Sequence, residues 1–140
     1  MLLSKSQSTT RTMRLQMQPG DTFLYSHPKT KKHLMIIVCS RIDDPVLGEI
    51  LHCVYLTTLN NTGNEDSVCM FHKGDHPFIA HDSYVEYSQL LHIRAEYLQR
   101  ELAIGFAIQK EPISATQLLA IKTAASDSDA IRPRSLTYFQ

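Results

Sequence analysis

The stretch HLMIIVCSRIDDPVLGEILHCVYLTTL, residues 33–59, decides the fold class of this chain. Its first ten residues form a nearly continuous apolar run, which is typical of a strand buried on both faces. DDPVLG then supplies Asp, Pro and Gly, which favour a tight connection. EILHCVYLTTL predicts a second long strand. On that strand one face carries Ile50, His52, Val54 and Leu56, and the other carries Leu51, Cys53, Tyr55 and Thr57.

The flanking sequence predicts further strands separated by short turns. A turn at 19–21 (PGD) leads into a strand at 22–27, and the basic turn HPKTKK follows it. After the polar loop 60–66, strands are expected at 67–71 and 84–88. Residues 90–103 predict a helix because apolar and long side chains recur there at spacings of three and four, at Leu91, Arg94, Leu98 and Leu102.

The last expected helix, 113–125, has the clearest start. Ser114 is an N-cap with Gln117 three residues on, and Ile113 can pack onto Leu118. Asp127 and Pro133 mark its end and an irregular tail. Because the expected strands come first along the chain and the helices last, we predict a mainly β fold with C-terminal helices. The expected architecture is a small, strongly curved antiparallel β-barrel of about five strands.

Composition narrows the class of protein. The 140 residues carry fourteen basic and fourteen acidic side chains, so no global basic field exists for nucleic acid, and binding would need a local patch. Residues 1–17 are polar and are expected to form a flexible arm before a single domain at 18–140. Three cysteines without a CxxC pair indicate free thiols in a reducing compartment. No apolar run is long enough for a membrane span, so we expect a cytoplasmic protein without membrane contact.

The stretch FHKGDHPFIAHDSYVEY, residues 71–87, admits three interpretations. His72, His76 and His81 offer metal-ligand atoms, but Gly74 and Pro77 disfavour a helix that would align them, so we expect neither a metal nor another cofactor. In a groove, His76 and His81 could instead act in acid–base chemistry together with Ser83, Tyr84 and Tyr87. The third interpretation is structural: Gly74, Asp75 and Pro77 form a turn, and Phe78 anchors it in the core.

Thr57 and Thr58 form a second candidate site, at the end of a predicted strand. Their hydroxyls suit contact with phosphate, and a cluster of cationic side chains precedes the neighbouring strand, at Lys29, Lys31, Lys32 and His33. Threonine is also simply a favourable strand residue. Gly-rich phosphate loops (GxGxxG, GxxxxGK[ST]), GxSxG and HExxH are all absent from the sequence.

Taken in order, several segments resemble the MazF/PemK-like toxins of bacterial toxin–antitoxin modules, whose fold is shared by CcdB. They are PGDTFLY, KTKKHLMIIVCS, VYLTTL, HDSYVEYSQLL, LAIGFAI and SATQLLAIKTAA, which together span about 18–125. The resemblance implies a homodimeric barrel that is a metal-independent endoribonuclease acting on single-stranded RNA and inhibited by a cognate antitoxin protein. The family's arginine before the buried strand is replaced here by Lys32 and His33.

From the residues and the resemblance together we predict two sets of site residues. The expected catalytic residues are His33, Thr57, Thr58, His76 and His81, with His76 and His81 facing a groove lined by the other three. The expected substrate-binding residues are Lys29, Lys31, Lys32, Lys73, Ser83 and Tyr84. The alternative is a non-catalytic, CcdB-like barrel that binds a protein or nucleic-acid partner.

Overall fold

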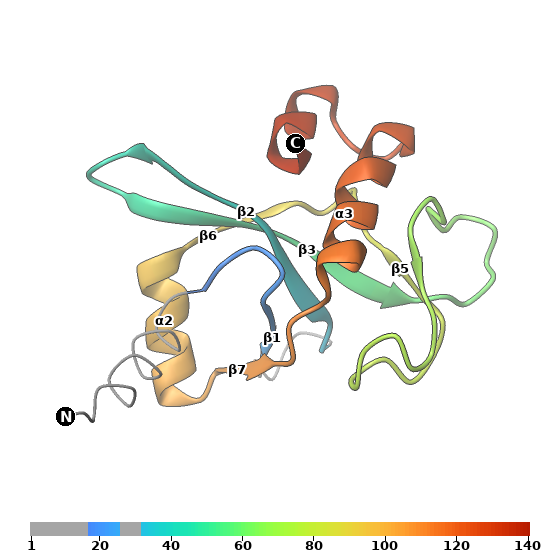
Figure 1. Ribbon diagram of the computed structural model, residues 1–140, viewed down its shortest axis with the longest axis horizontal. Coiled ribbons are helices and arrows are strands. Elements are labelled where there is room, and N and C mark those ends of the chain that lie inside the picture. Colours follow the sequence, from blue (N-terminus) through green and yellow to red (C-terminus); the bar gives the residue numbers. More distant parts are fainter. Residues whose placement is uncertain (1–16, 26–31) are drawn as a thin grey trace.

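The computed structural model describes residues 17–25 and 32–140 (Figure 1). The strands are β1 (Thr22–Tyr25), β2 (Leu34–Asp44), β3 (Gly48–Thr58), β4 (Met70–Phe71), β5 (Ser83–Val85), β6 (Leu91–Arg94) and β7 (Ala107–Lys110). The helices are α2 (Ala95–Ile104), α3 (Ala115–Ala124) and the 3-10 helices η1 (Ala125–Asp127) and η2 (Pro133–Phe139). The flexible arm expected at 1–17 lies outside the described residues except for Met17, which is buried.

The predicted pair of long strands forms the centre of the sheet. β2 and β3 pair antiparallel from Met35 opposite Tyr55 to Asp44 opposite Gly48. The turn is closed by a hydrogen bond from the Leu47 N–H to the Asp44 carbonyl, 3.1 Å. Gly48 has φ +75°, a left-handed conformation that glycine adopts without strain.

The sheet is antiparallel and open. Its strand order is β4-β5-β3-β2-β1-β7, and β6 pairs with β3 off this path. Because β2 occupies one edge of β3, the other edge is shared: β6 pairs with Ile50–Cys53 and β5 with Leu56–Thr58. The mainly β, antiparallel fold is therefore confirmed, whereas closure into a barrel is not, since β4 and β7 end the sheet without pairing to each other within the described part.

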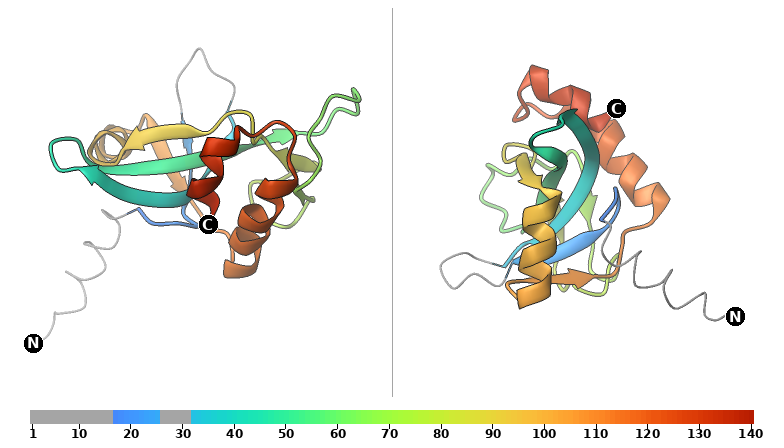
Figure 2. Two further views of the ribbon diagram at one scale, coloured as in Figure 1. Left: turned by 90° about the horizontal axis from the view of Figure 1, so that it is seen from above. Right: turned by 90° about the vertical axis from the view of Figure 1, so that its left-hand side faces the viewer.

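The part of the hairpin that contains Leu34–Val38 and Leu51–Val54 is buried on both faces, as its apolar pattern predicts, whereas the turn end with Ile42 and Val46 is exposed. One face, here called the α3 face, includes Val54 and Leu56 and is covered by α3, η1 and η2. The opposite α2 face includes Leu51 and Cys53 and packs against α2. Figure 2 shows α3 and the C-terminal helix on one side of the sheet and α2 on the other. The alternation predicted for 49–59 is thus confirmed.

Several elements differ from the prediction. The strands expected at 67–71 and 84–88 are the shorter β4 (Met70–Phe71) and β5 (Ser83–Val85). Residues 91–94 form strand β6 in place of the first turn of the expected helix, and the helix begins at Ala95. The free edge of β3 is the reason: Leu91 pairs opposite Cys53, so tertiary pairing outweighs a helical spacing of side chains. β7 was not predicted at all; it adds to the outer edge of β1, with Leu24 opposite Ile108.

In the C-terminal third, helix α3 begins where the sequence predicts, whereas the tail after it has a different structure from the predicted one. Ser114 Oγ accepts a hydrogen bond from the Gln117 N–H at 3.1 Å, and Gln117 Oε1 accepts one from the Ser114 N–H at 2.8 Å. The capping box is therefore confirmed. The expected irregular tail is instead the 3-10 helix η2, whose Phe139 is buried in the core.

Candidate functional site

The pairing of β3 with β5 brings four of the predicted residues together. Thr57 lies opposite Tyr84, and Thr58 lies opposite Ser83. Adjacent residues of a strand point to opposite faces, so these two pairs lie on opposite sides of the sheet. The structure therefore does not form one groove that contains both threonines.

Thr58 and Ser83 line a hollow of about 220 Å³ on the α3 face. His81, Phe78 and the apolar side chains of Leu34, Leu56 and Ile79 complete most of its wall. Ser83 Oγ donates to the main-chain carbonyl of His81 at 2.9 Å, which fixes the serine beside this segment. The His81 ring is exposed and makes no hydrogen bond or ion pair with any other described residue. Both of its nitrogens are therefore available to a ligand.

Phe78 gives the same hollow an aromatic surface. Its side chain was expected to anchor the turn in the core, but that expectation is wrong: Phe78 is 40% exposed and Ile79 is the buried residue. The ammonium of Lys110 lies 6.0 Å from the centroid of the Phe78 ring. A flat ring beside a cation, two hydroxyls and an imidazole suits a ligand that carries both a planar group and a negative charge.

Thr57 and Tyr84 belong to a polar strip on the α2 face. Tyr84 donates to Glu86 at 3.3 Å, and burial followed by the Glu86 charge raises the pKa of Tyr84. The Thr57 hydroxyl is buried and makes no hydrogen bond of ordinary geometry with the described residues. It lies near Tyr84 and lowers the pKa of Tyr84, as the smallest of the effects on that group. His33 stacks on Tyr55 with 4.5 Å between ring centroids. Its Nδ1 lies 3.0 Å from the carbonyl oxygen of Leu56, and His33 is not among the residues that line the hollow of His81.

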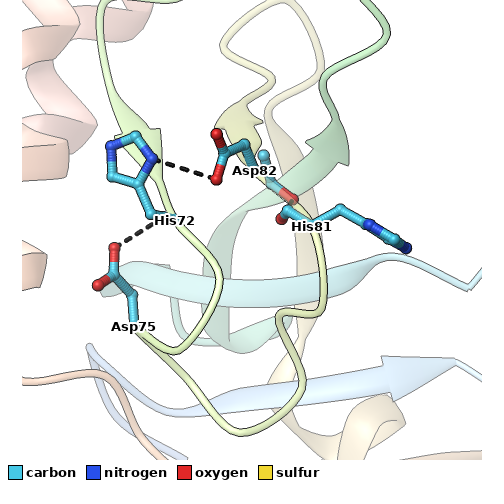
Figure 3. A network of polar contacts seen from close by, with 5 residues as sticks. His72, Asp75, His81 and Asp82 are labelled. Atoms are coloured by element: carbon cyan, nitrogen blue, oxygen red, sulfur yellow. Dashed lines mark hydrogen bonds and ion pairs between the residues drawn. The ribbon is translucent and has the colours of Figure 1, made fainter.

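The three histidines of 71–87 lie apart from one another. His72 forms an ion pair with Asp82 at 3.3 Å, and its main-chain N–H donates to Asp75 at 2.7 Å. Figure 3 shows the His81 ring pointing away from both of these contacts. Among the described residues no group of three or more His, Cys, Asp or Glu side chains could hold a metal ion. Gly74, with φ +93°, and Asp75 build the turn as predicted.

His76 is buried beneath that turn and does not face the hollow. Only 3% of its surface is exposed. Its Nε2 lies 2.6 Å from the Glu111 carbonyl oxygen, and its Nδ1 accepts a hydrogen bond from the Phe78 N–H at 3.0 Å. Both ring nitrogens are therefore occupied by the main chain, and the expected groove position of His76 is corrected to a structural one.

The remaining predicted residues divide into three groups. Lys29 and Lys31 lie outside the described residues. Lys32 and Lys73 are exposed. Tyr87 is fully buried and donates to the Ile121 carbonyl at 2.6 Å; burial raises its pKa far above the ordinary value.

One cluster of functional groups escaped the sequence analysis. His52 and His92 approach through their Nδ1 atoms at 2.7 Å, and Tyr138 stacks on His52 with 4.1 Å between centroids. Arg41 covers the Tyr138 ring at 4.6 Å and donates to Thr137. The available signal was His52 itself, a titratable residue on the otherwise apolar face of Ile50, Val54 and Leu56.

Comparison with known protein families, with characterised proteins and with solved structures gives no match. Within the described residues, no helix has the length and apolar character needed to cross a membrane.

Proposed function

We propose that this chain is a toxin-like, metal-independent endoribonuclease that binds single-stranded RNA in the hollow of Thr58, His81 and Ser83. The observation that carries the proposal is the meeting of these groups with the exposed Phe78 ring at one place. A nucleobase can stack on the ring, as in other proteins that bind single strands. Lys110 lies over the same ring and can neutralise the adjoining phosphate.

The chemistry assigned to the hollow is transesterification within the RNA. His81 removes the proton of a ribose 2′-hydroxyl, and O2′ attacks the adjacent phosphorus. The P–O5′ bond breaks, O5′ takes up a proton from water, and the hydroxide that forms takes the proton from His81, which returns to its neutral form. The products are a 2′,3′-cyclic phosphate and a 5′-hydroxyl end. Thr58, which lines the same hollow, donates a hydrogen bond to a phosphate oxygen as negative charge develops on it.

The test is cleavage of a single-stranded RNA by the full chain in the presence of a chelator. His81→Ala should lower the cleavage rate about a hundredfold or more, because general-base catalysis contributes that much. His72→Ala is the matched control, since His72 is also exposed on this loop but pairs with Asp82 outside the hollow. Cleavage that is unchanged in His81→Ala, or lost equally in both variants, would remove the assignment.

One observation favours a second, non-catalytic function. His33 and His76 were both expected to be catalytic, yet each contacts a main-chain carbonyl, of Leu56 and Glu111 respectively. This arrangement favours a non-catalytic fold that binds a partner through the Phe78 surface. RNA binding by the wild type, weakened about tenfold in Phe78→Ala but never followed by cleavage, would establish this alternative.

The proposal includes two protein partners. A second copy would pair through the outer edge of β7, where Ile104, Phe106 and Ile108 are exposed. The family resemblance implies a small barrel. In this chain an open sheet, in which β2 has register shifts at 37–39 and 41–44, would serve as the scaffold instead. A cognate antitoxin would cover the RNA-binding hollow. Suppression of growth by this chain, reversed by a small protein encoded beside it, is the corresponding test.

A further inference from the structure

A second hollow, of about 350 Å³, lies between the segment after β5 and the C-terminal segment. Its polar lining comes from Ser88, Gln89 and His92 on one side and from Arg132 and Ser135 on the other. It shares no lining residue with the hollow of Thr58, His81 and Ser83. Its volume is at the lower end of the range for small-molecule sites. We call it the Arg132 pocket.

The charge of the Arg132 pocket is positive and uncompensated. Arg132 is exposed and is the one permanently charged residue in the lining, which contains no acidic side chain. No ion pair engages Arg132 in the described part of the chain. Glu86 and Asp129, which lie close in sequence to the two walls, are both outside the lining, and Glu86 already accepts hydrogen bonds from Tyr84 and Ser88. The guanidinium is therefore free to bind an anion.

His92 supplies a second donor, because its partner His52 fixes its tautomer. One Nδ1 of the pair must carry the hydrogen of the 2.7 Å contact. If His92 donated, His52 would carry a hydrogen on its buried Nε2, which has no hydrogen-bond partner among the described residues. Buried N–H groups without acceptors are rare, so we assign the hydrogen to His52 Nδ1. His92 then accepts at Nδ1 and carries its own hydrogen on Nε2, the nitrogen not used by His52.

We propose that the Arg132 pocket binds a phosphate group, either free or carried by a small molecule. The Arg132 fork matches two phosphate oxygens, and His92 Nε2–H can donate to a third. The Gln89 amide and the Ser135 hydroxyl add neutral donors from the two sides of the hollow. A carboxylate presents two oxygens in one plane and a single charge, so it meets fewer donors from the two walls than a tetrahedral phosphate does. The inference does not depend on the proposed ribonuclease activity.

The experiment is a titration of the full-length protein with inorganic phosphate, followed by calorimetry and by the ¹⁵N resonances of His92. Ionic strength is held constant with chloride, and acetate and ribose 5-phosphate are titrated in parallel. We expect a phosphate dissociation constant on the order of millimolar and a shift of the His92 Nε2 signal. Arg132→Gln should weaken binding about tenfold or more, because it removes a charged hydrogen-bond donor.

Arg134→Gln is the control, since Arg134 is also an exposed arginine, two positions on, that does not line the pocket. It should change phosphate affinity less than about twofold if only general screening is altered. Tighter binding of ribose 5-phosphate than of phosphate identifies an esterified ligand, whereas equal binding identifies free phosphate. Absence of phosphate binding, equal affinity for acetate, or equal weakening by both arginine variants would overturn the proposal.

Discussion

Histidine side chains carry much of the chemistry that this sequence offers, and burial separates them into different roles. His81 is exposed beside two hydroxyls, His76 is enclosed by main-chain partners, and His52 is buried against another imidazole. Spacing along 71–87 correctly located a turn near the hollow. It could not show which histidine points outward, because the side that a turn residue faces depends on contacts such as that of His76 with Glu111, 35 residues away.

The first prediction concerns His76 and separates structure from catalysis. His76→Ala leaves the Glu111 carbonyl and the Phe78 N–H without their buried partner, so the free energy of unfolding should fall by about 2–3 kcal/mol. His72→Ala, at an exposed position of the same loop, should change it by less than about 0.5 kcal/mol. Urea denaturation measures both. Equal midpoints, with RNA cleavage lost only in His76→Ala, would instead restore a catalytic role for His76.

The second prediction is a dependence of stability on pH that arises from His52. Burial, and then the neighbouring His92 and Arg41, lower its pKa from 6.5 to about 4, while Asp43 acts weakly in the opposite sense. Between these two values the unfolded chain binds more protons than the folded chain, so folding stability rises with pH. The contribution is complete above pH 6.5 and is lost as the pH falls toward about 4.

Since one unit of pKa difference corresponds to about 1.4 kcal/mol, the lowering from 6.5 to about 4 sets an upper bound of about 3.5 kcal/mol. Screening by solvent reduces the expected loss to about 2 kcal/mol. Urea denaturation at several pH values measures it. His52→Phe keeps a ring against Tyr138 but does not titrate, so this variant should show a smaller slope across the window. An identical slope in the variant and the wild type would assign the titration to another group.

At the scale of elements, the sequence correctly predicted those strands and helices whose formation depends on residues within the element itself. The hairpin of β2 and β3 and the start of α3 are of this kind, because apolar alternation and a capping box act within a short segment. β6 and β7 could not be predicted in this way. Each is four residues long and exists because a neighbouring strand, β3 or β1, offers an unpaired edge.

The third prediction tests the capping box of α3. Ser114→Ala leaves the Gln117 N–H without its acceptor and should lower the free energy of unfolding by about 1 kcal/mol. Thr116→Ala is the control, because Thr116 lies exposed in the first turn and takes no part in the cap. Thermal or urea denaturation compares the two. A larger effect of Thr116→Ala would show that helix propensity, and not the cap, limits this end.

At the scale of the whole molecule, the sheet is uneven at its two ends. β4, at one end, is only two residues long, whereas β7, at the other, has four residues and a free edge in the described chain. Exposed apolar side chains lie in β7 and in the residues just before it: Ile104, Phe106 and Ile108. An apolar hollow of about 410 Å³ between α2 and β7 lies in the same region. An unpaired edge with apolar surroundings is a surface that proteins normally cover.

The fourth prediction is that a second copy covers this edge, so that the protein is a dimer at micromolar concentration. Two β7 strands related by a twofold axis would pair antiparallel and would bring the same apolar side chains of each copy together. Ile108→Lys places a charge at the centre of that contact and should give a monomer. Leu119→Lys, at an exposed leucine on α3, should leave the dimer intact. Sedimentation equilibrium measures the masses. A monomeric wild type, or a dimer that survives Ile108→Lys while Leu119→Lys dissociates it, would show that β7 is not the interface.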